Sequence, residues 1–460
     1  MGDTDGGVRD GALSRRALLG LLSAAALPST AALPLAATAG CSAGSAPAAP
    51  SGGAAAGGPL VWFSGEITQG VHDLRWAMRD AFERASPDTA VDVVSGPQST
   101  DSMRAALASV LKPGAVEPDA GRPDVYLGDV IWPAQFGAES YALALDGPEA
   151  LGRPYFNRFA AGLTAASQYR GHIYAAPFYT EQGLLYYRRD LLARHGVAPP
   201  ATWEDLAKAA LALKNAGEST YQFAWQGAAY EGLTCNWIEY LADRLGKADP
   251  ASDPADLASP GAVQALVFMQ ELINQKVSPV AVTQWQEVQS IDAFSGGQAA
   301  FLRGWNGSWN TILPDASPEA KRAMVGVAPL PFFAGGPAAP GGSGYCTAGG
   351  WSAFVNPRTD KPRASLDFVR WLTGEQAQRM LLTQGGLEPS VTAVRGDPAA
   401  GAVPPLAASS HAALAFRPSD NPAYPEVTKI LFTSVHSALP GGTSTPQAAL
   451  QNAAREIAKL

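Results

Sequence analysis

The sequence contains few cysteines, few histidines and little charge. Its 460 residues include three cysteines and five histidines, and neither a C-x-x-C pair nor a histidine cluster indicates a metal centre. Charged residues make up 16% of the chain and the formal net charge is -8, which excludes the basic surface that nucleic-acid binding requires. After position 58 the sequence has neither a GxSxG nucleophile elbow nor a phosphate-binding loop. We therefore expect no metal, no cofactor and no nucleic-acid partner.

The long apolar run of the sequence lies near its N-terminus. It extends from Leu18 to Ala37 and directly follows Arg15 and Arg16, which is typical of a twin-arginine export signal. Two prolines interrupt the run, so it is poorly suited to cross a membrane. After position 58 no apolar run is long enough to do so.

The end of this segment, Thr38-Ala39-Gly40-Cys41, resembles the lipobox of bacterial lipoproteins, in which small residues precede an acylated cysteine. Residues 1–40 are therefore expected to be a signal peptide and Cys41 the lipidated residue. A plain cleaved signal followed by a free cysteine is the alternative. Residues 41–58 are nearly all Ser, Gly, Ala and Pro, a composition typical of a flexible tether. We expect this tether to hold the protein at the extracytoplasmic face of the bacterial cell membrane through the lipid alone.

The two remaining cysteines, Cys235 and Cys346, are a candidate disulfide in an exported protein. Closing a loop of about 110 residues would stabilise the fold by about 4–5 kcal/mol in the chain-entropy treatment. Two isolated buried thiols are the alternative, and the sequence alone leaves both open.

Strands and amphipathic helices alternate after the tether. Short apolar strands are predicted at Leu60–Ser64, Val91–Val94 and Asp124–Leu127, which favours an α/β fold with a parallel sheet. Glu66 and Asp129 each follow one of these strands, where they either cap a helix or face a shared ligand site at the strand ends. Carboxylates accept paired sugar hydroxyls, so the second possibility points to carbohydrate recognition.

The stretch Ala176–Leu192 is predicted to connect two lobes. Pro177 is followed by Tyr179 and Glu181, and then by the β-rich run Leu184–Tyr187. We interpret this as one strand arriving at a crossing and another leaving it, with polar side chains available to a ligand between the lobes. An ordinary core strand that ends in a surface turn is the alternative.

Aromatic residues and an arginine in the second half of the chain complete the candidate site. Trp305 and Trp309 lie four residues apart beside glycines, and Gly350 precedes Trp351, which suits an aromatic wall that a sugar ring approaches closely. Arg417 is followed by a proline and is either a planar donor to sugar hydroxyls or part of a surface ion pair.

Taken in order, these stretches resemble the extracellular sugar-binding lipoproteins of carbohydrate ABC importers, and most closely their trehalose/maltose-binding branch. The resemblance extends over nearly all of Leu60–Leu460. Its most specific parts are Asp129–Phe136, Phe178–Leu192, Trp225–Gly227 and Tyr230–Leu233 with Cys235.

This resemblance implies a two-lobed periplasmic-binding-protein fold of type II, with two α/β lobes joined by a multi-strand hinge and the ligand in the cleft. We expect residues 59–177 and 331–371 to form the first lobe, and residues 178–330 and 372–460 the second. By the same resemblance the ligand-binding positions are Glu66, Asp129, Tyr179, Glu181, Trp305, Gly350, Trp351 and Arg417.

The resemblance also implies a function without catalysis. A monomeric binding protein would capture a neutral di- or oligosaccharide of the trehalose or maltose type and deliver it to the transmembrane subunits of an ABC permease. An exported carbohydrate-active hydrolase is the alternative, since pairs such as Glu66 with Asp129 are the residue types that glycosidases use.

Overall fold

The computed structural model describes residues 58–67, 73–115, 122–218, 221–337 and 339–460. The expected signal peptide, the expected lipidation site Cys41 and almost all of the expected tether lie outside the described residues.

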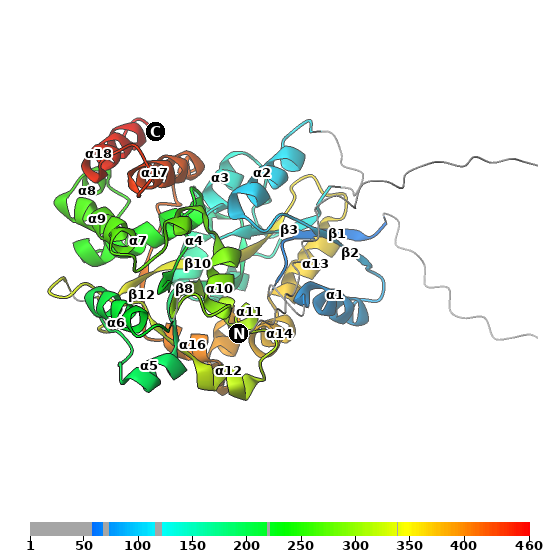
Figure 1. Ribbon diagram of the computed structural model, residues 1–460. Coiled ribbons are helices and arrows are strands. Elements are labelled where there is room, and N and C mark those ends of the chain that lie inside the picture. Colours follow the sequence, from blue (N-terminus) through cyan, green and yellow to red (C-terminus); the bar gives the residue numbers. More distant parts are fainter. Residues whose placement is uncertain (1–57, 68–72, 116–121, 219–220, 338) are drawn as a thin grey trace, which may run out of the picture. The chain divides into compact units, whose positions relative to one another are not determined.

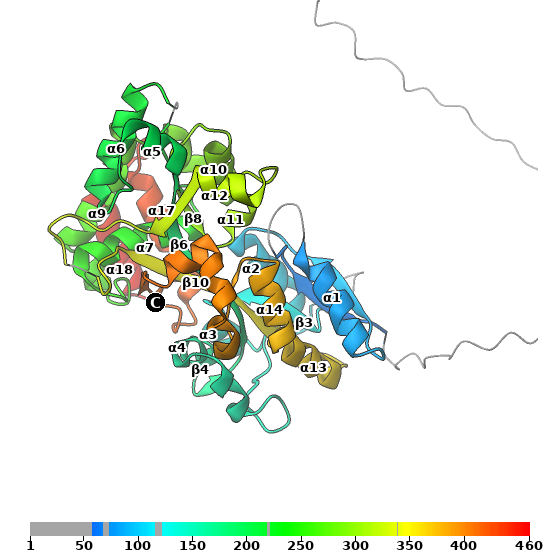
Figure 2. The same cartoon turned by 90° about the horizontal axis from the view of Figure 1, so that it is seen from below.

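Two α/β lobes are built on one mixed sheet. Ten strands of the described residues join in it, with the main order β2-β1-β3-β10-β6-β8-β7. In Figures 1 and 2, helices α1 and α13 lie beside β1 and β2, whereas α7, α9, α17 and α18 lie together on the opposite side of the folded part of the chain. The two-lobed fold implied by the resemblance is confirmed.

The first lobe begins with three parallel strands, as the sequence predicts. β1 (Leu60–Ser64) pairs with β2 (Val91–Ser95) on one side and with β3 (Val125–Asp129) on the other. Between them run the helices α1 (Leu74–Ala85) and α2 (Thr100–Leu111). Because parallel strands end at the same edge of a sheet, the residues after β1, β2 and β3 come together there.

Two long strands, β6 (Ala176–Arg188) and β10 (Tyr345–Val355), connect the lobes and pair antiparallel with each other. β10 also pairs with β3 of the first lobe, and the last residues of β6 pair with β8 (Phe301–Trp305) and β9 (Val325–Pro329) of the second. The expectation of two separate strands in the first crossing is wrong, because β6 is one continuous strand of 13 residues.

The second lobe is covered by helices that pack against one another. α7 (Glu231–Leu245) packs against α9 (Pro260–Asn274) and α17 (Tyr424–Ala438), and α17 packs against α18 (Pro446–Ile457). Ser259 caps α9 by accepting the N–H of Ala262, as its position before a proline predicts.

The boundary that we expected at residue 371 is wrong. The helix α13 (Pro362–Leu372) spans this position, and α14 (Glu375–Thr383) follows it. Side chains from both pack in one apolar cluster with Trp62 and Phe82 of the first lobe, and this cluster continues to Leu406. The first lobe therefore extends past residue 372, since burial of these apolar faces decides the lobe to which a helix belongs.

Among the helices of the described residues, none has the length and apolarity needed to cross a membrane. The remaining elements are short or lie at the surface of the lobes. They are α3 (Pro133–Ala138), η1 (Arg153–Arg158), α4 (Ala161–Ala166), β4 (Gln168–Tyr169), β5 (His172–Ile173), α5 (Arg189–His195), α6 (Trp203–Asn215), β7 (Phe223–Ala224), α8 (Pro254–Leu257), η2 (Val280–Gln284), α10 (Glu287–Ser295), α11 (Ser308–Thr311), α12 (Pro318–Met324), β11 (Glu388–Pro389), α15 (Thr392–Arg395), η3 (Pro398–Ala402), α16 (Pro404–Ser409) and β12 (Ala413–Ala415).

Candidate functional site

Two adjoining hollows bring all eight expected ligand-binding residues together. The first hollow, of about 710 Å³, is lined by Glu66 and Tyr179. The second, of about 650 Å³, is lined by Asp129, Gly350 and Arg417. We call the two hollows together the cleft. The residues that line both are Gln98, Glu181, Glu287, Trp305 and Trp351.

Sheet register places three of these side chains in a row. Trp351 of β10 lies directly opposite Asp129 of β3 on one side and Tyr179 of β6 on the other. Directly opposed residues of antiparallel strands present their side chains on the same face. The row therefore carries a carboxylate, an indole and a phenol side by side across the hinge.

Gly350 allows β10 to pass close to β6. Its φ is +133°, and a Cβ atom there would meet the carbonyl oxygen of Tyr179 at 2.3 Å. Only glycine fits this conformation and this approach.

Two indoles form walls of the cleft. Trp351 meets Trp132 edge to face, with ring centroids 6.0 Å apart. The guanidinium of Arg303 lies 3.9 Å from the centre of the Trp305 ring, so a cation covers one side of that indole. Trp132 itself is 1% exposed and belongs to the core.

Arg417 is neither a surface ion pair nor a free donor. Its Nη1 donates to Glu231 at 2.9 Å, and its Nη2 donates to the carbonyl oxygen of Ala348 at 3.0 Å and contacts Asp129 at 3.4 Å. Its side chain is 3% exposed. Burial raises the pKa of both carboxyl groups, while the Arg417 charge opposes that shift. Arg417 thus holds two carboxylates from different lobes at the edge of the second hollow.

Glu181 lies at the junction of the two hollows, on β6. It accepts a hydrogen bond of 3.2 Å from the N–H of Gly307. Burial raises the pKa of this carboxyl group from its ordinary 4.5 to about 7, and the charges of Glu287 and Asp129 add to the increase.

The stability of the protein should therefore depend on pH through Glu181. Between pH 4.5 and about 7 the folded state binds more protons at this residue than the unfolded state, so stability falls as the pH rises through this window. Glu181→Gln keeps an oxygen for the N–H of Gly307 and cannot ionise. We therefore expect the melting temperature of Glu181→Gln minus that of wild type to be larger above about pH 7 than below pH 4.5.

The matched control is Glu319→Gln, since Glu319 is exposed in the first turn of α12. A difference between Glu181→Gln and wild type that stays constant with pH would contradict the shifted ionisation.

The remaining expected residue, Glu66, follows β1 and is exposed at the rim of the first hollow. Further lining residues were missed in the sequence, among them Gln98, Tyr230 and Glu287. Gln98 follows β2 in the same way that Glu66 follows β1, so the position after a parallel strand could have indicated it. The other two come from the start of helices and show no local signal.

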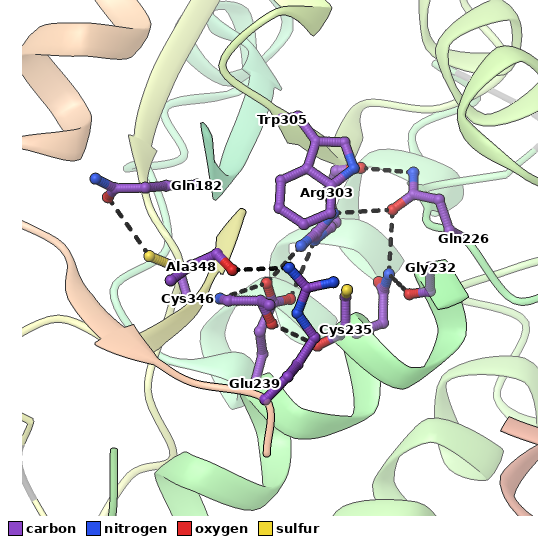
Figure 3. A network of polar contacts seen from close by, with 12 residues as sticks. Gln182, Gln226, Gly232, Cys235, Glu239, Arg303, Trp305, Cys346 and Ala348 are labelled. Carbon is purple, nitrogen blue, oxygen red and sulfur yellow. Dashed lines mark hydrogen bonds and ion pairs between the residues drawn. The ribbon is translucent and has the colours of Figure 1, made fainter. Parts of the chain in front are cut away.

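The expected disulfide between Cys235 and Cys346 is wrong, since both are free, buried thiols. The hydroxyl of Thr347 donates to the carbonyl oxygen of Cys235 at 2.9 Å, so β10 faces α7 with Thr347. Neighbouring side chains of a strand point to opposite faces, and Cys346 accordingly contacts Gln182, with its sulfur 3.6 Å from Oε1 (Figure 3). Burial raises the pKa of both thiols.

The described residues contain no group of three or more His, Cys, Asp and Glu side chains that could hold a metal ion. What the cleft does offer is several carboxylates, indole faces and a guanidinium. This combination suits a polar ligand with many hydroxyl groups, because carboxylates accept hydroxyl hydrogen bonds and indoles cover the C–H faces of rings.

Comparison with known proteins agrees with the geometry. The maltose-bound MalE3 of T. maritima has a similar structure, with a TM-score of 0.75 and 32% sequence identity over 87% of this chain and 99% of its own. A probable ABC transporter-binding protein of Deinococcus radiodurans is 34% identical over 326 residues, which are 69% of this chain and 73% of its own. A maltotriose-binding protein of Pyrococcus abyssi is 25% identical over 60% of this chain and 56% of its own.

Residues 73–379 match the family profile described as bacterial extracellular solute-binding protein. This match covers more than half of the chain, and it agrees with the two lobes, the strands that connect them and the cleft. The chain therefore belongs to the family of bacterial extracellular solute-binding proteins.

Proposed function

We propose that this protein captures a neutral disaccharide or short oligosaccharide of the trehalose or maltose type and delivers it to an ABC permease. The observation that carries the proposal is the cleft itself. Two indoles, several carboxylates and one arginine come from distant parts of the chain and line adjoining hollows. The names of the maltose-bound and maltotriose-binding relatives support the same ligand class.

Capture follows from contacts to both lobes. Asp129 belongs to the first lobe, Glu181 to the hinge and Trp305 to the second lobe. A sugar that bonds to all three binds the closed arrangement better than an open one, so it shifts the population by that difference in free energy. Polar contacts between the lobes support the closed form too, such as the bond of 3.1 Å from the N–H of Glu231 to Asp101. The closed form would then be the one that the permease recognises.

The lipid anchor and the place of action remain part of the proposal. Twin-arginine export and acylation at Cys41 rest on the sequence alone. A monomer tethered by its lipid would keep the cleft near the permease without spanning the membrane.

Isothermal titration calorimetry with trehalose, maltose and maltotriose tests the function. We expect at least one of them to bind, and Trp351→Ala to weaken that binding about tenfold or more, a loss of about 1.4 kcal/mol, because one wall of the cleft is removed. Trp76→Ala is the matched control, since Trp76 is a 42% exposed indole on α1 that lines neither hollow.

Two results would contradict the proposal. Binding of none of these sugars would refute the ligand class, and equal affinity in Trp351→Ala and wild type would remove Trp351 from the site. Release of glucose during incubation would instead support the hydrolase alternative, so the same samples are analysed for products.

A further inference from the structure

The carboxylate of Glu287 lies between two aromatic side chains of the cleft. Glu287 is the first residue of α10. Its Oε1 accepts the indole N–H of Trp305 at 3.3 Å, and its Oε2 accepts the hydroxyl of Tyr230 at 2.8 Å. Each carboxylate oxygen therefore holds one aromatic group of the site in place.

These two hydrogen bonds leave part of the carboxylate unused. An ionised carboxylate offers about four acceptor positions, and Glu287 fills two of them within the protein. The same side chain lines both hollows of the cleft. Its remaining acceptor positions are therefore available to a ligand beside Trp305.

The ring of Trp305 is also held from another direction. Arg303 lies against the ring at 3.9 Å from its centre, and Glu239 fixes the guanidinium through bonds of 2.5 and 3.1 Å (Figure 3). Arg303 thus covers one side of the indole, while Glu287 fixes the rotation of the ring through its N–H. Because the ring is already held in position, little conformational entropy is lost when a ligand binds against it.

We propose that Glu287 is a further ligand-binding residue that determines specificity, accepting a sugar hydroxyl next to the Trp305 ring. This inference rests on the proposed function and assigns to the same cleft a carboxylate that neither a strand end nor a sequence motif indicates. The ligand hydroxyl must lie near the edge of the ring that stacks on Trp305, because one carboxylate serves both the indole and the ligand.

Calorimetry with maltose and its monodeoxy analogues tests the inference on wild type, Glu287→Ala and Glu287→Gln. We expect Glu287→Ala to weaken maltose binding about tenfold or more, and Glu287→Gln to weaken it less, since the amide retains one acceptor oxygen. For the one analogue that lacks the hydroxyl in question, Glu287→Gln should weaken binding less than it weakens maltose binding. The hydrogen bond that the substitution removes is already absent from that complex. Glu319→Gln, exposed in the first turn of α12, controls for loss of a first-turn charge.

The outcomes separate the two claims. An equal penalty of Glu287→Gln across all the analogues would show that Glu287 only positions Trp305 and Tyr230, and it would overturn the inference while the proposed function stands. Unchanged maltose affinity in both variants would overturn it as well. Absence of binding by wild type to maltose, trehalose and maltotriose alike would overturn the proposed function and the inference with it.

Discussion

Replacing Glu239 by alanine is expected to lower the free energy of unfolding by about 3–5 kcal/mol. The side chains of Glu239 and Arg303 are 2% and 1% exposed and form a close ion pair. Removal of the carboxylate leaves the Arg303 guanidinium buried without its counter-charge, and it also removes the acceptor for the N–H of Thr347 at 3.0 Å. Urea denaturation of the purified protein measures the loss.

An exposed ion pair provides the control for this variant. Asp367 and Arg370 form a bond of 2.8 Å on α13, where both side chains are largely exposed. Asp367→Ala should change the free energy of unfolding by no more than about 1 kcal/mol. Comparable losses in the two alanine variants would show that burial of the Glu239–Arg303 pair is not what matters.

Arg417→Ala is expected to reduce both stability and sugar affinity. The stability loss should again be about 3–5 kcal/mol, because Glu231 and Asp129 lose their shared cation in a buried site. Affinity for the sugar should fall more than tenfold, since Arg417 also borders the second hollow and holds Asp129 toward it. Urea denaturation and calorimetry measure the two effects separately, and Arg417→Lys, which keeps the charge, should lose less of both.

The pH dependence distinguishes unpaired charge from lost packing in this variant. Without Arg417 the pKa values of Asp129 and Glu231 should rise further above those of the unfolded chain, because burial raises them already and the opposing charge is gone. The loss of stability that comes from these unpaired carboxylates is present at neutral pH and disappears as the pH falls below the pKa values of the unfolded chain. A stability loss of equal size in acid and at neutral pH would instead indicate a packing defect.

The hinge explains why side chains so distant in sequence act as one site. β10 brings Trp351 between Asp129 and Tyr179, and Gly350 permits the close approach of the two hinge strands. The close pairing of β10 with β3 and β6 therefore places these side chains beside one another.

Local chemistry was sufficient for the elements near strand and helix ends. The strand Leu60–Ser64 has the predicted bounds, and the side chains of Thr202 and Ser259 cap the first turns of α6 and α9. These features depend on neighbouring residues only: apolar runs, capping oxygens and first-turn prolines. For the same reason the position of Glu66 just after a strand, and that of Asp129 at the end of one, are enough to make them candidates for the ligand site.

Long-range packing decided what the sequence left open or suggested wrongly. Two cysteines in an exported chain suggest a disulfide. The register of β10, however, directs Thr347 toward Cys235 of α7 and the side chain of Cys346 to the opposite face of the strand. Likewise Arg417 could have been a surface residue, and only the approach of α7 and β3 buries it between two carboxylates.

The sequence by itself thus determined the α/β class and the export-type N-terminal pattern, because both are encoded in residue types at short spacing. The candidate residues of the cleft were implied by the resemblance to the sugar-binding proteins of ABC importers. The tertiary structure alone decided that β6 is continuous, that the thiols stay apart and that Glu287 joins the cleft beside Trp305. The physical reason is that these outcomes depend on which faces of remote elements meet when apolar surface is buried. A residue pattern over a few positions does not determine those contacts.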